Sequence, residues 1–548
     1  MQPGALHRLF ASTADRHPSK PALTFVQPGG GDDVTYTYDE LFESVAKLGA
    51  ELRNVYEDSS APLGLLMSSQ EDQVLHYLAA LSIGAVPAIL TPPHRKLNRA
   101  YYLETMGEVL RRCQFGAIVS DVDGMDWPAT VLEPHTFSPR TWSFRSTGSV
   151  APADELSPPL DASFMQFSSG TTGIKKGVMV KDEAVITQLI TYGRALGLGE
   201  EDCIVSWLPL YHDMGFIACL NMPLAHGVHT VMIDPVAWVS NPAIYLQSVS
   251  RHAGTLSWHP NFAYAFMAGR VRDDSLHGVD LSSLRGLVNC SEPVTHKSQQ
   301  LFLERFARWG LADGVFMGCY AMAETTFALT HGEPDDPLTL DRRGPDHDTN
   351  VPRPVVSVGR PLPEVDLAIV DPESRAVLPE REVGEIWVRS PFNFFGYYNE
   401  DEATSQAFVD DWYRTGDLGY RIDDSFYIVG RSKDVLIVAG VNVFPQDIEE
   451  TVSDVEGVHS GRVSAFSALD ERVQTERVVI VAESDDHDSD AARRIVQEIR
   501  TRMLAGFQIS NMEVLLVPPG WLVKSTSGKM ARNANHRKWA DVFERSDR

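Results

Sequence analysis

Apolar residues recur along the first 330 residues with two alternating spacings. Residues 4–17 place Leu6, Leu9 and Phe10 at helical spacing, and the apolar run at 22–26 is typical of a buried strand. The alternation of helical and strand-like segments continues through further apolar runs at 61–68, 85–90 and 115–121. Strands that alternate with helices predict parallel sheets whose faces are covered by helices.

The pattern changes twice after residue 330. Residues 333–354 are rich in Pro, Asp and Arg and have almost no apolar periodicity, which predicts an exposed insertion or, more simply, a surface connection. From residue 356, short apolar runs separated by turn residues predict a small β-barrel or sheet. After Gly430, strand-like and helical runs indicate a compact α+β unit of ordinary minimum domain size. We therefore place a boundary at residues 430–433.

Length, charge and cysteine content narrow the class of protein. A chain of 548 residues exceeds the size of one hydrophobic core, so we expect at least two domains. The net charge of -26 disfavours broad contact with nucleic acid or an anionic membrane, so any polyphosphate site must be built locally. Five cysteines without a C-x-x-C pair favour a reducing cytoplasm. We see neither a signal peptide nor the ~20 apolar residues of a membrane span, and expect a soluble cytoplasmic protein.

The first motif with chemical content is a Gly/Ser/Thr-rich loop at 164–180, FMQFSSGTTGIKKGVMV. An apolar strand enters the loop, glycines allow tight turns, and hydroxyls and lysines add donors, which is the composition of an anion-binding nest. The spacing of a Walker A loop is absent, and an exposed Ser/Gly-rich loop would explain the segment taken alone. The candidate phosphate-binding residues are Ser168, Ser169, Gly170, Thr171, Thr172, Gly173 and Lys176.

Later motifs each place polar residues in a turn. Glu324 in GCYAMAETT offers the hard carboxylate oxygens that Mg²⁺ prefers, and Asp417 in YRTGDLG offers two oxygens suited to ribose hydroxyls. Lys529 follows a glycine in LVKSTSGKMARN, where a mobile loop can deliver its charge to a phosphate; Lys524 is its neighbouring competitor. Taken one at a time, a packed corner or a solvated side chain would explain each of these residues.

In this order the motifs resemble the acyl-adenylate-forming superfamily, which includes acyl-CoA synthetases, nonribosomal adenylation domains, luciferases and fatty acyl-AMP ligases. The resemblance covers essentially the whole chain, and YHDMG at 211–215 and PQDIE at 445–449 are closest to fatty acyl-AMP ligases. Lys175 stands where the superfamily usually has proline, and Cys290 stands where a small glycine is common. The resemblance implies an α/β fold with a large N-terminal adenylation domain (1–430) and a small, mobile α+β C-terminal domain (431–548).

The resemblance also implies a role for individual residues. Glu324 would hold magnesium and act with Lys529 and His212 as a catalytic residue, while Lys433 would be the hinge. The implied nucleotide-binding residues, besides the phosphate loop, are Ser291, Glu292, Pro293, Tyr320, Ala321, Met322, Asp417 and Arg431. The implied acyl-binding residues are Trp207, His212, Met214 and Gly215.

The implied activity is the ATP- and Mg²⁺-dependent conversion of a carboxylic acid, fatty or otherwise apolar, to acyl-AMP with release of pyrophosphate. The acyl group would then pass to the phosphopantetheine of an acyl carrier protein. An extra segment before V-G-R-P disfavours coenzyme A in fatty acyl-AMP ligases; here Glu324 and Gly359 are 35 positions apart, and LDRR at 340–343 resembles that segment. Two alternatives stay open: an acyl-CoA synthetase that uses coenzyme A, and a non-catalytic nucleotide- or acyl-binding module.

Overall fold

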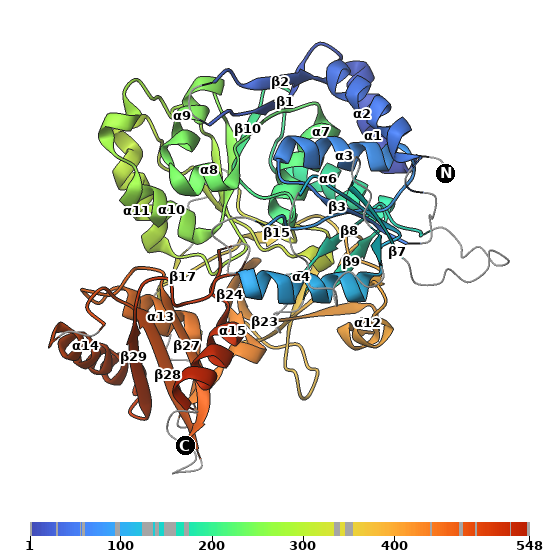
Figure 1. The fold of residues 1–548 in the computed structure, drawn as a ribbon. Coiled ribbons are helices and arrows are strands. Elements are labelled where there is room, and N and C mark those ends of the chain that lie inside the picture. The colour runs from blue at the N-terminus through green and yellow to red at the C-terminus, as the bar shows by residue number, and fades with distance from the viewer. Residues whose placement is uncertain are drawn as a thin grey trace.

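The computed structural model in Figure 1 describes most of the chain. The described residues are 3–28, 31–54, 56, 61–93, 99–122, 135–136, 142–146, 160–168, 175–333, 340–345, 354–438, 441–470, 475–487, 490–525 and 528–544. Most of the insertion expected at 333–354 therefore lies outside the described residues.

A seven-stranded sheet forms the centre of the larger part of the molecule. Its strand order is β14-β13-β12-β10-β11-β1-β2, and all neighbours are parallel except β1 and β2. The strands are β1 (Pro21–Phe25), β2 (Val34–Thr37), β10 (Cys203–Ser206), β11 (His229–Met232), β12 (Leu256–His259), β13 (Gly286–Asn289) and β14 (Phe316–Gly318). β10, β12, β13 and β14 are buried at every position, as expected of parallel strands covered on both faces.

Helices connect these strands and cover the sheet (Figure 1). They are α6 (Asp182–Ala195), α7 (Met222–His226), α8 (Pro235–Ser240), α9 (Ala243–His252), α10 (Asn261–Arg270) and α11 (His296–Phe306). A π-helix, η1 (Met214–Asn221), precedes α7, and every one of its residues is buried. π-Helical turns are rare and occur frequently at functional sites, so the segment after β10 is a candidate part of a functional site.

A second sheet lies in the N-terminal part of the chain, with strand order β4-β3-β5-β7-β6. Its strands are β3 (Leu63–Leu66), β4 (Pro87–Ile89), β5 (Ala117–Ser120), β6 (His135–Thr136) and β7 (Trp142–Ser146). The accompanying helices are α1 (Ala5–Arg16), α2 (Tyr38–Leu52), α3 (Gln70–Ser82) and α4 (Arg99–Cys113). Thr37 and Glu40 form a capping box that fixes the start of α2.

Between residues 355 and 431 the strands pair antiparallel, in the region where short apolar runs predicted a small β-barrel or sheet. Strands β19 (Asp366–Val370), β20 (Gly384–Arg389), β22 (Phe408–Val409), β23 (Trp412–Ile422) and β24 (Ser425–Arg431) form one five-stranded sheet. A three-stranded sheet joins β8 (Phe164–Phe167) and β9 (Gly177–Val180) to β21 (Gly396–Tyr397), next to α12 (Asp401–Ala407). Smaller pairs join β15 (Thr330–His331) with β18 (Arg360–Pro361), and β16 (Leu340–Asp341) with β17 (Val355–Val356).

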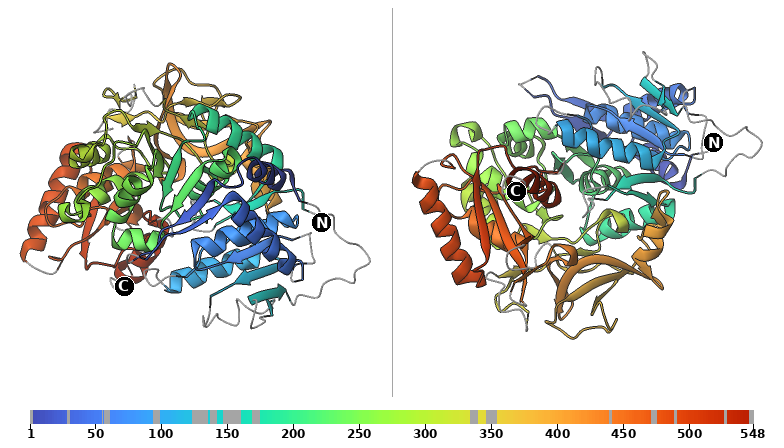
Figure 2. Two further views of the ribbon diagram at one scale, coloured as in Figure 1. Left: turned by 90° about the horizontal axis from the view of Figure 1, so that it is seen from above. Right: turned by 60° about the horizontal axis from the view of Figure 1, so that its bottom comes forward.

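The last part of the chain has its own sheet and its own core. Its elements are β25 (Leu436–Val438), β26 (Val441–Val443), α13 (Pro445–Ser453), β27 (Val463–Asp470), β28 (Thr475–Glu483), α14 (Asp490–Phe507), β29 (Met512–Val517) and α15 (Arg532–Trp539). One buried cluster runs from Leu6 to Phe426, and a separate cluster from Leu436 to Val514. In Figures 1 and 2 the strands and helices of this part gather at one side of the molecule.

Two ion pairs join this part to the rest of the molecule. Lys297 Nζ lies 2.6 Å from Asp454 Oδ1, and Arg537 lies 3.4 Å from Glu104 Oε1. The α/β fold expected from the alternating pattern is confirmed, and the short apolar runs after residue 356 form an antiparallel sheet, one of the two arrangements that they predicted. Within the described residues, no helix combines the length and the apolar character that crossing a bilayer requires.

Candidate active site

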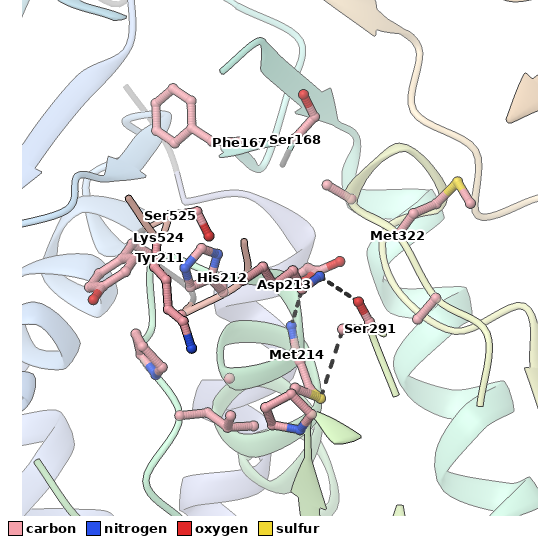
Figure 3. A pocket seen from close by; sticks show the side chains of 18 of the residues that line it. Phe167, Ser168, Tyr211, His212, Asp213, Met214, Ser291, Met322, Lys524 and Ser525 are labelled. Atoms are coloured by element: carbon pink, nitrogen blue, oxygen red, sulfur yellow. Dashed lines mark hydrogen bonds between the residues drawn. The ribbon is translucent and has the colours of Figure 1, made fainter. Parts of the chain in front are cut away.

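The motifs found in the sequence meet at one edge of the central sheet. Trp207, Pro260, Ser291 and Ala321 follow the carboxyl ends of β10, β12, β13 and β14, which are neighbouring strands. All four residues line one cavity of about 910 Å³, to which the C-terminal part contributes residues 520–525, 528 and 529. Figure 3 shows part of this cavity, with His212, Asp213 and Lys524 facing it. Ligands bind at this edge in open α/β sheets, because loops from several parallel strands converge there.

Asp417, which is buried, and Arg431, which is partly exposed, form a charge pair beside the cavity. The antiparallel register of β23 and β24 sets the two residues opposite each other, and Arg431 Nε forms an ion pair with Asp417 Oδ1 at 2.8 Å. The Tyr320 hydroxyl donates to the other oxygen, Oδ2, at 2.7 Å. Asp417 raises the pKa of the Arg431 guanidinium, which therefore stays charged. The carboxylate is held from two sides and keeps lone pairs for further hydrogen bonds.

Glu324 is a partly buried carboxylate on the turn after β14. Gln166 Nε2 donates to the carbonyls of Ala323 (2.8 Å) and Thr326 (3.0 Å), and the Tyr397 hydroxyl donates to Glu324 Oε1 at 3.0 Å. Burial raises the pKa of Glu324. Within the described part of the chain, no cationic side chain lies within 4.0 Å of this carboxylate. A cavity-facing carboxylate of this kind has the donor chemistry that Mg²⁺ prefers.

Aromatic side chains form the apolar side of the cavity. Trp207 stacks on Trp238 with ring centroids 3.5 Å apart, and its Nε1 donates to His259 Nδ1 at 2.9 Å, so the indole is fixed on its face and at its edge. Phe262 meets Trp207 edge-on at 6.3 Å. A Cβ at Gly215 would lie 2.4 Å from the Pro209 carbonyl oxygen, so the turn that opens η1 requires glycine. The resulting surface suits an apolar acid.

The C-terminal part contributes two lysines to the same cavity. Lys529 Nζ donates to the Ser291 carbonyl oxygen, across 238 positions of sequence. Gly528, whose φ is +82°, lies against the Phe262 ring, so the loop reaches deep into the site. Lys524 also lines the cavity, and burial lowers its pKa to about 8. The structure therefore brings the motif at 522–533 to the turn after β13.

Most of the residues that the sequence singled out lie on this cavity. Those that line it are Ser168, Lys176, Trp207, His212, Met214, Gly215, Ser291, Ala321, Met322, Glu324, Arg431, Lys433 and Lys529. Tyr320 and Asp417 lie immediately behind the lining, and the Glu292 carboxylate accepts from the Phe262 N–H at 3.1 Å, next to Pro293. Ser169, Gly170, Thr171, Thr172 and Gly173 lie outside the described residues.

Several contributors to the site have no role in the sequence interpretation. Tyr397 holds Glu324 from 73 positions away, and Lys176 Nζ lies 4.3 Å from the Tyr397 ring centroid. Lys175, the departure from proline, donates to Thr91 Oγ1 at 3.2 Å, and burial lowers its pKa to about 8. Asp213 lines the cavity between His212 and Met214. Local motifs could flag Lys175 and Asp213, but no local signal links residue 397 to residue 324.

Comparisons with known proteins agree with this geometry. The family model described as "AMP-binding enzyme" matches residues 10–398. The long-chain-fatty-acid–AMP ligase FadD26 of Mycobacterium marinum is 29% identical over 592 residues, with 98% of each chain covered. The 4-hydroxyphenylalkanoate adenylyltransferase of the same organism is 28% identical, covering 100% of this chain and 93% of that protein. A Legionella pneumophila fatty acyl-adenylate ligase, solved with acyl adenylate and pyrophosphate, is 26% identical with a TM-score of 0.70, covering 98% of this chain and 96% of that one. The chain therefore belongs to the AMP-binding enzyme family, within the acyl-adenylate-forming superfamily that its motifs resemble.

Proposed function

We propose that this protein is an ATP-dependent ligase that converts a fatty or other apolar carboxylic acid to acyl-AMP and pyrophosphate. The observation that carries the proposal is the single cavity that combines an aromatic wall, the Glu324 carboxylate, the Asp417–Arg431 pair and the Lys529 amine. Relatives named for fatty-acid–AMP ligation and for adenylyl transfer support the same reaction and the same class of acid.

The chemistry requires positioning and charge neutralisation rather than a protein nucleophile. An oxygen of the substrate carboxylate forms a bond to the α-phosphorus of ATP, and the bond from that phosphorus to the oxygen bridging the β-phosphate breaks, which releases pyrophosphate. Two anions approach each other in this step, so preorganised cations lower the barrier. We assign Lys529 to the charge that develops at the carboxylate and α-phosphate. Asp417 and Arg431 would bind the ribose side of the nucleotide, and Ser291, Glu292, Pro293, Tyr320, Ala321 and Met322 the adenine side.

Magnesium fits the residues on the phosphate side. Glu324 presents a carboxylate that Tyr397 orients through one oxygen, and its burial disfavours an uncompensated negative charge. A divalent cation bound there would neutralise charge on the phosphates. Ser168 and Lys176 lie on the same cavity, and we assign them, with the loop that joins them, to the phosphates.

We assign residues 1–430 and 431–548 to two domains, with Lys433 at the hinge. The separate core of the C-terminal part supports this division, and so does the position of Lys433 on the cavity wall next to β24. Rotation of the C-terminal domain after adenylation would withdraw Lys529 and open the site to the acyl acceptor. A Lys433→Pro variant should keep acyl-AMP formation and lose acyl transfer; full transfer by this variant would contradict the assignment.

We propose the phosphopantetheine of an acyl carrier protein as the acceptor, and free coenzyme A as the second candidate. The wording of the motifs at 211–215 and 445–449, and the relative named as an AMP ligase, support the carrier. The third reading, a binding module without catalysis, is disfavoured because the cavity holds Lys529, Glu324 and Arg431 together. The cytoplasmic location expected from the cysteine content stays a prediction.

A mass-spectrometric assay tests the proposal. The protein is incubated with ATP, Mg²⁺ and a panel of fatty, aryl and amino acids, with and without coenzyme A, and acyl-AMP and acyl-CoA are quantified. We expect acyl-AMP to form from apolar acids. We also expect that adding coenzyme A does not convert this acyl-AMP to acyl-CoA. Prompt formation of acyl-CoA would identify the second candidate acceptor. Absence of both products with every acid would refute the proposed activity.

A further inference from the structure

Asp213 is a partly buried carboxylate in the middle of the candidate site, and the reaction outlined above gives it no role. It caps the start of η1, where its Oδ1 accepts a hydrogen bond from the Met214 N–H at 2.9 Å. Its side chain lines the cavity and points toward Ser291 in Figure 3. Burial is the largest effect on this group and raises its pKa. A carboxylate that is partly removed from water is stabilised when a positively charged side chain lies near it.

The partner comes from the other end of the chain. Lys529 lines the same cavity as Asp213, and its positive charge lowers the pKa that burial raises. The Lys529 amine donates to the Ser291 carbonyl oxygen, and Ser291 Oγ lies 4.0 Å from Met214 Sδ, next to Asp213. Asp213 therefore belongs to the part of the cavity wall that receives the C-terminal loop.

We infer that Asp213 is a positioning residue for Lys529: its carboxylate draws the amine into the cavity and holds it there for the adenylation step. The inference rests on the proposed function, because it acts through the lysine assigned to that step. The Ser291 carbonyl fixes where the amine lies but carries no net charge. Asp213 adds the negative charge that favours a protonated lysine at this place, and that selects the domain arrangement in which Lys529 is inside the site.

Helix capping alone does not account for this arrangement. Asp234 has the same capping geometry at α8, where its Oδ1 accepts from the Ala237 N–H at 2.8 Å, and it also lines the cavity. Asp234 lies at the start of α8, whereas Asp213 lies next to Met214, whose Sδ is 4.0 Å from Oγ of Ser291, the residue whose carbonyl accepts from Lys529. Asp234 is therefore a matched control: an acid of the same cavity and the same capping role, without the link to Lys529.

A double-mutant cycle tests the inference, because residues that act through one another are not additive. Initial rates of acyl-AMP formation are measured by mass spectrometry for the wild type, Asp213→Asn, Lys529→Ala and the double variant, using an acid that the wild type activates. We expect Asp213→Asn to lower kcat about 10- to 100-fold, as loss of positioning does, with a small change in KM for ATP. In the Lys529→Ala background the same substitution should have no further effect.

Two measurements separate this role from a structural one. Binding of AMP, followed by calorimetry, should be unchanged in Asp213→Asn, which shows that the N-terminal site is folded. Asp234→Asn should change the rate of acyl-AMP formation by the same factor in the wild type and in the Lys529→Ala background, whatever the size of that factor. Additive losses for Asp213→Asn and Lys529→Ala would overturn the inference while leaving the proposed function intact, because the wild type would still form acyl-AMP. Wild-type protein that formed no acyl-AMP would instead remove the proposed function on which the inference rests.

Discussion

Replacing Asp417 with Asn should raise the KM for ATP and leave kcat almost unchanged. The amide has the shape of the carboxylate, but it carries no charge and keeps only one acceptor oxygen, whereas Tyr320 and Arg431 contact the two different oxygens of Asp417. If Asp417 binds the ribose hydroxyls, the substitution weakens charge-assisted hydrogen bonds that form equally in the ground state and in the transition state. Hydrogen bonds to a charged group contribute about 1.5–3 kcal/mol, which corresponds to an increase in KM of about 10- to 150-fold.

The substitution should also lower stability, since it leaves the Arg431 guanidinium beside a neutral partner. The Arg431 side chain is 36% exposed, so water compensates part of the loss. We therefore expect a cost of about 1–2 kcal/mol, below the 3–5 kcal/mol typical of breaking a fully buried pair. The protein must be assayed well below its unfolding temperature, so that the change in KM is measured on folded enzyme.

The chain offers a closely matched control for this prediction. Asp341 is a buried aspartate that also accepts from a tyrosine hydroxyl, Tyr420 at 2.8 Å, and pairs with an arginine, Arg381 at 3.0 Å. Neither of these partners lines the cavity, whereas Arg431, the partner of Asp417, does. Asp341→Asn should lower stability without changing the KM for ATP. Pyrophosphate release is measured against ATP concentration for both variants. Equal KM values for Asp417→Asn and Asp341→Asn would refute the assignment of Asp417 to the nucleotide.

Three further predictions follow from other parts of the site. Glu324→Gln should raise the Mg²⁺ concentration needed for half-maximal pyrophosphate release, and an unchanged Mg²⁺ titration would argue against this residue as the metal ligand. Gly215→Val should reduce acyl-AMP formation from every acid, because a Cβ would meet the Pro209 carbonyl oxygen at 2.4 Å, and overpacking costs about 1–3 kcal/mol; wild-type activity and thermal stability would contradict it. Burial lowers the pKa of Lys175 from 10.5 to about 8. The buried positive charge therefore destabilises the folded protein fully below pH 8, and this destabilisation decreases as the pH rises toward 10.5. Chemical denaturation should show Lys175→Met gaining most over wild type near pH 7 and least near pH 10, and a pH-independent difference would exclude this titration.

Much of the architecture could be predicted from the sequence because the local signals agree with the fold. Buried runs such as CIVS at 203–206 and LSWH at 256–259 are apolar enough for parallel strands covered on both faces. Thr37 and Glu40 mark the start of α2 through a capping box. The motifs directly follow strands that are neighbours in the sheet, so local patterns and strand order together place them at one edge.

The rest of the site depends on contacts that no local pattern encodes. Tyr397 reaches Glu324 across 73 positions, and Lys529 reaches Ser291 across 238. The stacking of Trp207 on Trp238 depends on the packing of α8 against the turn after β10. Asp213 was visible in its motif, but its relation to Lys529 arises only from the way the C-terminal part meets the rest of the molecule.

The central claim is that this cavity makes acyl-AMP and that Lys529 provides the essential charge. The most direct measurement is single-turnover formation of acyl-AMP by wild type, Lys529→Ala and Lys524→Ala, two lysines of one loop that face the same cavity. The account predicts a loss of about 10²- to 10³-fold for Lys529→Ala, the size expected for removing one preorganised charge donor, and a much smaller loss for Lys524→Ala. Equal losses for the two variants, or the larger loss for Lys524→Ala, would contradict it.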